Sequence, residues 1–541
     1  MGDFSGIDPD ALLKTIGSFK RDKEKLRNGA SSIKAQLDRF GIDVQPLNNL
    51  AAISGWLDDQ LPMLQRRQAL AAALEKQHPG LSTVRVPEPY SMGAADAALL
   101  QQALAGKDQA AINLVKSDLR KHLNDEEFLK AYSDASPPND VTAFQGLPAD
   151  VADKLNRLRL HAAVQNPDCP QRLKDLWQHL TNPKDKLYKS STFLLGFDDV
   201  GMGHVAVSYG NPDTAANTAV YVPGTGSSLD DAKGDLNRAL KLYGTANAEK
   251  PGSTASIYWL GYDAPQWDIL SGGPAVSSYA DAGAPKLAAF VNSLKPNHIG
   301  ADHVTLIGHS YGSTVVGDAF ANAGMKADDA IFVGSPGVKV DKASDLHLDP
   351  SHVWAGKAKF DPVPEVSAPL NPLEWYDDHH VRFGNDPTSS AFGGQTFDTG
   401  DGSGVDHAHS EYWDPGPSLN NMTNIVLGQT DKVTAMPTEQ KIGAIPNLAD
   451  LPMPPIISAP DMGGAVLQNA GHAMGDWGAP IEHTGDALHA FGQAGNNVIG
   501  AGGDLLSGDV DGTSDDLSDF GDDLKASGKG VVHAGEDLLD W

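Results

Sequence analysis

Apolar residues recur along this chain with two different periods, and the period changes near residue 190. The first part opens with Asp8-Pro9, an N-cap followed by proline at the first helical position. Apolar side chains then return every seven residues, at Leu12, Phe19, Leu26, Ile33 and Phe40. A heptad of this kind predicts a helix that packs along a partner helix.

A second helical pattern begins near Leu50 and contains Pro62, which should bend the helix. Together the two patterns predict a helical hairpin over residues 9–77. We place this hairpin within an α-helical region that spans residues 1–140.

Beyond Ser191 the pattern becomes one of short strands separated by helices. Strands are predicted at 192–197, 204–209, 219–222, 256–260, 304–307, 330–333 and 352–355, and helices at 230–243, 284–294 and 313–320. Strands and helices that alternate in this way are typical of a mainly parallel sheet covered on both faces. The sequence therefore predicts an α/β domain over residues 141–430.

The remainder comprises a Pro-rich linker at 431–460 and a segment at 461–541 in which Gly or Ser recurs every seven residues, with one slip. A small residue every two turns would let a helical tail lie close against another helix. However, the segment also holds 15 carboxylates and only two lysines, as a solvated acidic tail would. Both hypotheses stay open.

The strongest chemical signal lies between the predicted strand 304–307 and the predicted helix 313–320. The connecting residues are Gly308-His309-Ser310-Tyr311-Gly312, a G-x-S-x-G motif. A strand that turns directly into a helix forces a tight, strained backbone at the serine and leaves no room for bulk at the flanking glycines. We therefore predict that Ser310 is a nucleophile, although a Gly-Ser turn without catalytic function would also fit.

A serine hydroxyl becomes nucleophilic when an imidazole takes its proton and a carboxylate orients that imidazole. The acid should follow a later strand, which favours Asp361, just after the predicted strand 352–355. Asp341, Asp345 and Asp349 are the alternatives, since Asp361-Pro362 also fits simple turn chemistry.

The histidine should come last, beyond a final strand that we place at 381–383. His409 is preferred to His407, and His379 and His380 are more distant candidates. A His-x-His pair also occurs in metal sites, but no nearby cysteine or paired carboxylate completes one, so no metal is predicted.

The oxyanion that forms on attack needs two backbone N–H donors. Tyr311, directly after the nucleophile, should supply the first. Thr225 in the loop Pro223-Gly224-Thr225-Gly226 is the predicted second donor, because glycines let backbone amides turn inward.

Composition narrows the classes of protein further. The formal charge of −29 over 541 residues argues against a nucleic-acid partner. The one cysteine, Cys169, excludes an internal disulfide and a cysteine-based metal site. No apolar run approaches the roughly 20 residues of a membrane span, and the N-terminus lacks the pattern of a cleaved signal peptide. We expect a cytoplasmic protein, or one exported by another route.

With these residues in view, the segment 146–413 resembles a mainly actinobacterial family of α/β-hydrolases first catalogued as a domain of unknown function. The resemblance rests on four stretches: Leu147-Pro148-Ala149-Asp150 with Leu155-Asn156-Arg157, Val222-Pro223-Gly224-Thr225-Gly226, Gly308-His309-Ser310-Tyr311-Gly312, and His409-Ser410-x-Tyr412. It implies an α/β-hydrolase fold, Ser310 as nucleophile and His409 as base, in an enzyme of the esterase or lipase type. Relatives often carry a larger residue at the position of Thr225.

The hairpin also resembles the small helical proteins exported by type VII secretion in actinobacteria, whose turn carries Trp-x-Gly. Here the predicted turn region holds Ser54-Gly55-Trp56, with the order reversed, so a plain structural hairpin is the alternative. Secretion machinery or a chaperone would bind through the helical ends.

Taken together, the sequence predicts a serine hydrolase that cleaves small-molecule or lipid esters without a cofactor. Trp259, Tyr262, Trp267 and Tyr279 either line an acyl site or belong to the core. The opposing hypothesis is an exported effector, toxin or interaction module in which the hydrolase domain is mainly a scaffold.

Overall fold

A computed structural model gives the fold of the chain. It describes residues 7–40, 45–77, 91–137, 140–266, 277–300, 302–359, 361, 363–364, 383–400 and 408–437. The predicted tail at 461–541, most of the linker at 431–460, and Trp267, His379, His380 and His407 lie outside the described residues.

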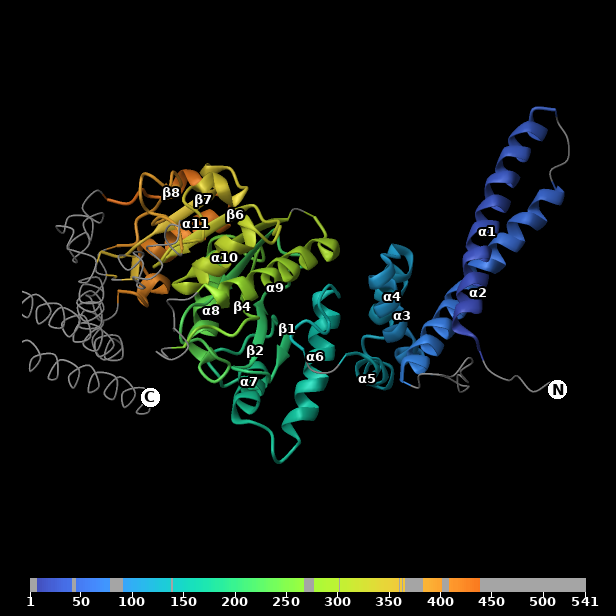
Figure 1. The fold of residues 1–541 in the computed structure, drawn as a ribbon, viewed down its shortest axis with the longest axis horizontal. Coiled ribbons are helices and arrows are strands. Elements are labelled where there is room, and N and C mark those ends of the chain that lie inside the picture. The colour runs from blue at the N-terminus through green and yellow to red at the C-terminus, as the bar shows by residue number, and fades with distance from the viewer. Residues whose placement is uncertain are drawn as a thin grey trace, which may run out of the picture. The chain divides into compact units, whose positions relative to one another are not determined.

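The chain divides into two compact units, of which the first is helical and combines residues up to 143 with residues 150–163. Figure 1 labels its helices, which are α1 (Pro9–Asp38), α2 (Gln45–Gln77), α3 (Met92–Gly106), α4 (Gln109–Lys121), α5 (Glu126–Ala135) and most of α6 (Ala149–Val164). As the sequence predicts, Asp8 caps α1: its carboxylate accepts hydrogen bonds from the Asp10 and Ala11 amides at 3.0 and 2.9 Å.

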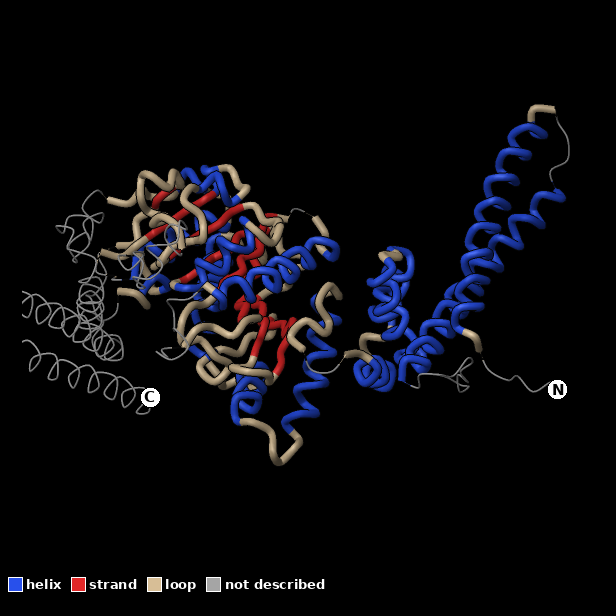
Figure 2. Tube along the Cα trace, viewed as in Figure 1, coloured by secondary structure: helices blue, strands red, loops and turns tan. Residues whose placement is uncertain are grey.

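The helices α1 and α2 pack along each other, as Figure 2 shows. The position of Ser54-Gly55-Trp56 differs from the prediction, because these residues lie within α2 rather than in the turn. Trp56 is 56% exposed there. The helix α2 begins at Gln45, earlier than the predicted start near Leu50. Its first residues, from Gln45 to Asn49, show no hydrophobic periodicity from which this start could be predicted.

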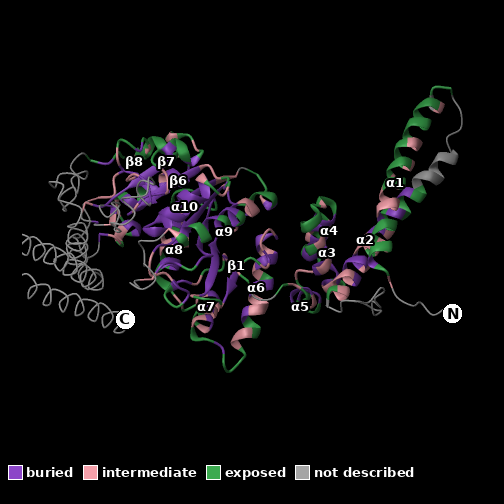
Figure 3. Ribbon diagram, viewed as in Figure 1, coloured by how far each residue is buried: buried purple, intermediate pink, exposed green. Residues whose placement is uncertain are grey.

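The second unit is built on a single sheet that Figure 3 shows as largely buried. Its strands are β1 (Thr192–Asp198), β2 (His204–Tyr209), β3 (Asn217–Val222), β4 (Thr254–Leu260), β5 (His303–His309), β6 (Asp329–Val333), β7 (Val353–Gly356) and β8 (Gln395–Thr396). They lie in the order β1-β2-β4-β3-β5-β6-β7-β8. The pairs from β4 through β8 are parallel, while β1 and β2 are antiparallel additions at one edge.

The helices of this unit are α7 (Gln171–Thr181), α8 (Ala232–Glu249), α9 (Ser278–Leu294), α10 (Tyr311–Ala321) and α11 (Pro417–Val426). The chain steps from β3 to β4 in one direction and from β5 to β6 in the other. Because such crossovers are right-handed, α8 and α10 must cover opposite faces. The predicted mainly parallel sheet with helices on both faces is confirmed.

The strand order places a switch point between β3 and β5, which are neighbours although the chain leaves them in opposite directions. At such a point the loops beyond the carboxyl ends of the two strands diverge and leave a crevice. The loop after β3 carries Thr225, and Ser310 follows β5. The fold therefore brings the two predicted halves of the site together at the carboxyl ends of the parallel strands.

One predicted strand, at 381–383, lies mostly outside the described residues. The sequence pattern favoured 381–383 as the last strand before the histidine, but Phe383 lies in a turn, and Val381 and Arg382 fall outside the described residues. In the described chain the last strand is β8, whose two residues are too few to show an alternating pattern. Among the described helices, none combines the length and apolar character needed to cross a membrane.

Candidate active site

Ser310 lies in the tight turn between β5 and α10 with an unusual backbone conformation, φ 54° and ψ −133°. A positive φ of this kind is unfavourable for a non-glycine residue, so the surrounding structure must hold it in place. The two glycines of the motif allow the backbone segments around the turn to approach each other closely. A Cβ on Gly308 would lie 2.6 Å from the Ser313 Cα, and one on Gly312 would lie 2.3 Å from the Val222 carbonyl oxygen.

The loop after β3 lies directly against this turn. A Cβ on Gly224 would be 2.6 Å from the Ser310 Cβ and 2.9 Å from the Tyr311 backbone nitrogen. Glycine at 224 thus keeps the space beside the serine and the Tyr311 amide open. The neighbouring Gly226 amide donates to the Pro265 carbonyl at 2.9 Å, which ties this loop to the segment after β4.

His409 and Asp361 form a hydrogen-bonded pair. The His409 Nδ1 lies 3.0 and 2.9 Å from the two Asp361 carboxylate oxygens. The Asp361 side chain is completely buried, whereas that of His409 is 19% exposed. Asp361 follows β7, as its position in the sequence predicts, and the alternatives Asp341, Asp345 and Asp349 are all exposed.

Gly334, directly after β6, makes room for this pair. Its φ is +54°, and a Cβ there would lie 2.7 Å from the Asp361 Oδ2 and 3.0 Å from the His409 Nδ1. The preceding residue, Val333, accepts a hydrogen bond from the Ser310 amide at 3.1 Å. The carboxyl end of β6 therefore contacts the serine turn on one side and the histidine and acid on the other.

The three predicted residues thus lie around the carboxyl end of β6. His409 and Asp361 are joined by a hydrogen bond, whereas Ser310 lies beside them. His309, the neighbour of Ser310, has its ring centroid 4.6 Å from that of His409. Among the described contacts no hydrogen bond joins the Ser310 hydroxyl to the His409 ring. Such bonds are often long in unliganded enzymes and shorten when substrate binds.

Two contacts near the pair were not predicted. The His309 Nε2 lies 2.8 Å from the His409 carbonyl oxygen, and the Tyr412 hydroxyl donates to Asp361 Oδ2 at 2.5 Å. Burial holds the pKa of His309 well below its ordinary value, so the ring is neutral and donates its single proton to that carbonyl. His309 and Tyr412 both lie inside motifs quoted above, but residue type alone gave no sign of which partner each would meet.

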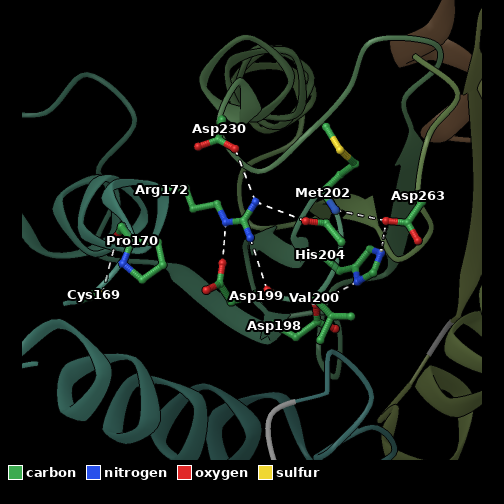
Figure 4. A network of polar contacts seen from close by, with 11 residues as sticks. Cys169, Pro170, Arg172, Asp198, Asp199, Val200, Met202, His204, Asp230 and Asp263 are labelled. Atoms are coloured by element: carbon green, nitrogen blue, oxygen red, sulfur yellow. Dashed lines mark hydrogen bonds and ion pairs between the residues drawn. The ribbon is translucent and has the colours of Figure 1, made fainter. Parts of the chain in front are cut away.

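A separate polar network, shown in Figure 4, holds the turn between β1 and β2 and the loops beside the carboxyl end of β4. The His204 Nδ1 lies 2.8 Å from Asp198 Oδ1, and its Nε2 faces Asp263 Oδ1 at 3.4 Å. Asp263 also accepts from the Met202 amide at 3.1 Å. The Arg172 guanidinium bonds to Asp199 and reaches Asp230 at 3.4 Å. The turn between β1 and β2 is thereby tied to the loop after β4.

The aromatic residues predicted for an acyl site fall into two groups. Trp259 and Tyr262 are 2% and 1% exposed and belong to the core, where the Tyr262 hydroxyl donates to the Pro223 carbonyl at 2.8 Å. Tyr279 is half-buried, and its ring meets that of Tyr311 edge to face.

Comparison with known proteins agrees with the fold of the second unit. Residues 198–372 match the family model described as alpha/beta hydrolase, a range that includes Ser310 and Asp361 and ends before His409. The strand order and this match define the class: the second unit has the α/β-hydrolase fold.

The similar proteins are mycobacterial. An uncharacterized protein of Mycobacterium tuberculosis, Rv2079, is 38% identical over 268 residues, which are 46% of this chain and 40% of that protein. Another, Rv0963c, is 33% identical over 158 residues, which are 28% of this chain and 58% of that protein. An uncharacterized Mycobacterium bovis protein, Mb0988c, matches to the same extent. The chain thus spans less than two thirds of the length of these relatives.

Proposed function

We propose that this protein is a serine hydrolase that cleaves carboxylic esters, with Ser310 as nucleophile, His409 as base and Asp361 as the orienting acid. The observation that carries the proposal is the bond between His409 Nδ1 and the buried Asp361, beside a serine held at φ 54°. A buried carboxylate on Nδ1 leaves Nε2 as the basic nitrogen, which is the protonation pattern that general-base catalysis at a serine requires. The α/β-hydrolase match supports a hydrolytic reaction.

In the proposed reaction the Ser310 oxygen attacks the ester carbonyl carbon while its proton passes to His409. The tetrahedral intermediate collapses as His409 returns that proton to the departing alcohol, which leaves an acyl group on Ser310. Water then gives a proton to His409 and attacks the acyl carbon. The carboxylic acid leaves, and the serine regains its proton.

The negative charge on the carbonyl oxygen would be stabilised by the amide of Tyr311 and by that of Thr225. Tyr311 is the first residue of α10, so its amide points out of the helix end, where the helix dipole also favours an anion. Thr225 lies in the loop that Gly224 brings against Ser310. The amide of Gly226 already donates to Pro265, which supports Thr225 over Gly226 as the second donor.

Labelling with a fluorophosphonate probe tests the proposal, because this reagent reacts with activated serines. The full chain should take up one label, and a Ser310→Ala variant should take up none. Hydrolysis of p-nitrophenyl acetate should fall by at least about a thousandfold in Ser310→Ala. A scaffold without activity would leave wild type and variant equally unlabelled, and that result would refute the proposal.

Acyl specificity follows from the same assay with p-nitrophenyl esters of increasing chain length. A lipid ester is the proposed substrate class, so kcat/KM should rise with chain length, because each buried methylene contributes about 0.8 kcal/mol to binding. A preference for acetate over every longer chain would contradict a lipid substrate while leaving esterase activity in place.

A further inference from the structure

Tyr412 occupies an unusual position, because its hydroxyl joins two parts of the candidate acid loop. The hydroxyl donates to Asp361 Oδ2 at 2.5 Å and accepts from the Ala358 amide at 3.0 Å. Tyr412 itself is 1% exposed and stands three residues after His409 in the short helix Glu411–Trp413. One side chain therefore connects the histidine segment to the loop that follows β7.

Three donors together fix the Asp361 carboxylate. The Val363 amide donates to Oδ1 at 3.0 Å, Tyr412 donates to Oδ2, and the His409 Nδ1 faces both oxygens. A buried carboxylate with fewer partners would be destabilised by desolvation and could rotate to find others. With Val363 and Tyr412 in place, its plane is set so that both oxygens meet the imidazole.

The hydroxyl is chemically suited to this role. Burial, followed by the charge of Asp361, holds the pKa of Tyr412 well above its ordinary value. The group therefore keeps its proton across the whole pH range in which a histidine base works. It always donates its hydrogen bond to Asp361, and it never takes up the proton that His409 exchanges.

The ring of Tyr412 is held by its neighbours as well. His309 packs edge-on against Tyr412 and Trp413, with ring centroids 5.9 and 5.4 Å away. Trp413 is 1% exposed, and the Arg238 guanidinium lies 5.4 Å from the centroid of its ring. The segment 409–413 is thus anchored to the core, so the hydroxyl of Tyr412 cannot easily leave its two partners.

We propose that Tyr412 is a positioning residue of the candidate active site, which holds the Asp361 carboxylate in the orientation that faces His409. This inference rests on the proposed function for its catalytic consequence, but the orientation of the carboxylate is a property of the protein whether or not it hydrolyses esters. Two separate readouts therefore test the positioning role of Tyr412 and the proposed ester hydrolysis independently.

The test is Tyr412→Phe, which keeps the ring and removes the hydroxyl. Tyr258→Phe is the matched control, since the buried Tyr258 hydroxyl has no hydrogen-bond partner within the described structure. The first readout is the NMR resonance of the His409 Nδ1 proton, assigned with His409→Gln. This resonance should move upfield or broaden in Tyr412→Phe and stay unchanged in Tyr258→Phe.

The second readout is ester hydrolysis. In Tyr412→Phe, kcat should fall between about tenfold and about a hundredfold at nearly constant KM, because substrate binding is untouched while the base is misoriented. The acid limb of kcat/KM should move to lower pH, because less of the carboxylate charge would face the protonated imidazole.

An unchanged His409 proton resonance in Tyr412→Phe would overturn the inference, whatever the activity of the protein. An acid limb that moves to higher pH would also overturn it, because Tyr412 would then weaken the carboxylate rather than orient it. If wild type fails to react with fluorophosphonate but the resonance shifts as expected, the positioning role stands and the esterase proposal falls.

Discussion

At the scale of single residues, the candidate site depends on glycines that keep backbone and side chains close together. Gly308 and Gly312 flank the serine in its motif and Gly224 lies in the predicted oxyanion loop, whereas Gly334 belongs to no predicted motif. Gly224 and Gly334 each have catalytic candidates within 3.0 Å of the position that a Cβ would take. Any side chain at these two positions would clash with the site. The residues next to them in the sequence do not show which groups it would clash with.

Gly224→Ala should therefore slow acylation strongly without unfolding the protein. The added methyl group would lie 2.6 Å from the Ser310 Cβ and 2.9 Å from the Tyr311 amide nitrogen, so the loop must withdraw from the serine. We expect the rate of fluorophosphonate labelling to fall at least about a hundredfold. Stopped samples resolved on gels would measure it.

Gly234→Ala provides the control for this substitution, because Gly234 lies in α8 and an added methyl group would find no atom within 4 Å in the described structure. Alanine is favoured over glycine in a helix by up to roughly 1 kcal/mol, and Gly234 lies in the first turn of α8, so this variant should label normally and melt no lower than wild type. Normal labelling of Gly224→Ala would show that the loop after β3 does not shape the site.

At the scale of elements, a buried cation holds three helices of the first unit together. Arg66 of α2 donates from Nε to Asp96 of α3 at 2.7 Å and from Nη2 to Asp118 of α4. Asp96 is fully buried, and its Oδ2 has no hydrogen-bond partner among the described atoms. Burial outweighs the attraction of Arg66 and raises the pKa of Asp96 to about 6.

The stability of this unit should therefore fall as pH rises from about 4 to about 6. In that window the native Asp96 binds a proton that the unfolded chain, with an Asp pKa near 3.8, has already released. The native state loses this advantage as pH passes its higher pKa, at a cost of about 3 kcal/mol at most. Hydrogen exchange of peptides from 92–106, corrected for intrinsic rates, measures the effect.

Asp96→Asn removes the titrating group while Arg66 keeps Asp118 as a partner, so the fall across this window should disappear from exchange in 92–106. Equal slopes in wild type and variant would mean that another group governs the pH dependence. The proteolytic fragments of the α/β unit serve as an internal reference, because Asp96 lies outside it.

At the scale of the whole molecule, negative charge dominates. The chain holds 70 acidic and 41 basic side chains, for a net charge of −29. Repulsion among like charges opposes the compact state, and salt screens it. Raising NaCl from about 0.1 M to about 1 M shortens the Debye length from about 10 Å to about 3 Å.

The melting temperature should accordingly rise with NaCl over this range. Calorimetry of the full chain would follow it, with choline chloride as a second salt to separate screening from specific sodium binding. A melting temperature that falls with both salts would mean that attractive surface ion pairs, such as Lys241 with Asp414, outweigh the net repulsion.

The sequence by itself determined the parallel sheet, the hairpin helices and the serine turn, because each of these follows from a local rule: a hydrophobic period, a capping residue, or a turn that only glycines permit. It also singled out Asp361 from the end of a strand and His409 from chain order. The tertiary structure decided what lies beside them. Tyr412 contacts Asp361 from 51 residues away, and His309 contacts the His409 carbonyl from 100 residues away. The open spaces beside Gly224 and Gly334 likewise depend on how separate segments pack against each other. Such contacts depend on distances across the folded chain, and no local pattern of residues encodes them.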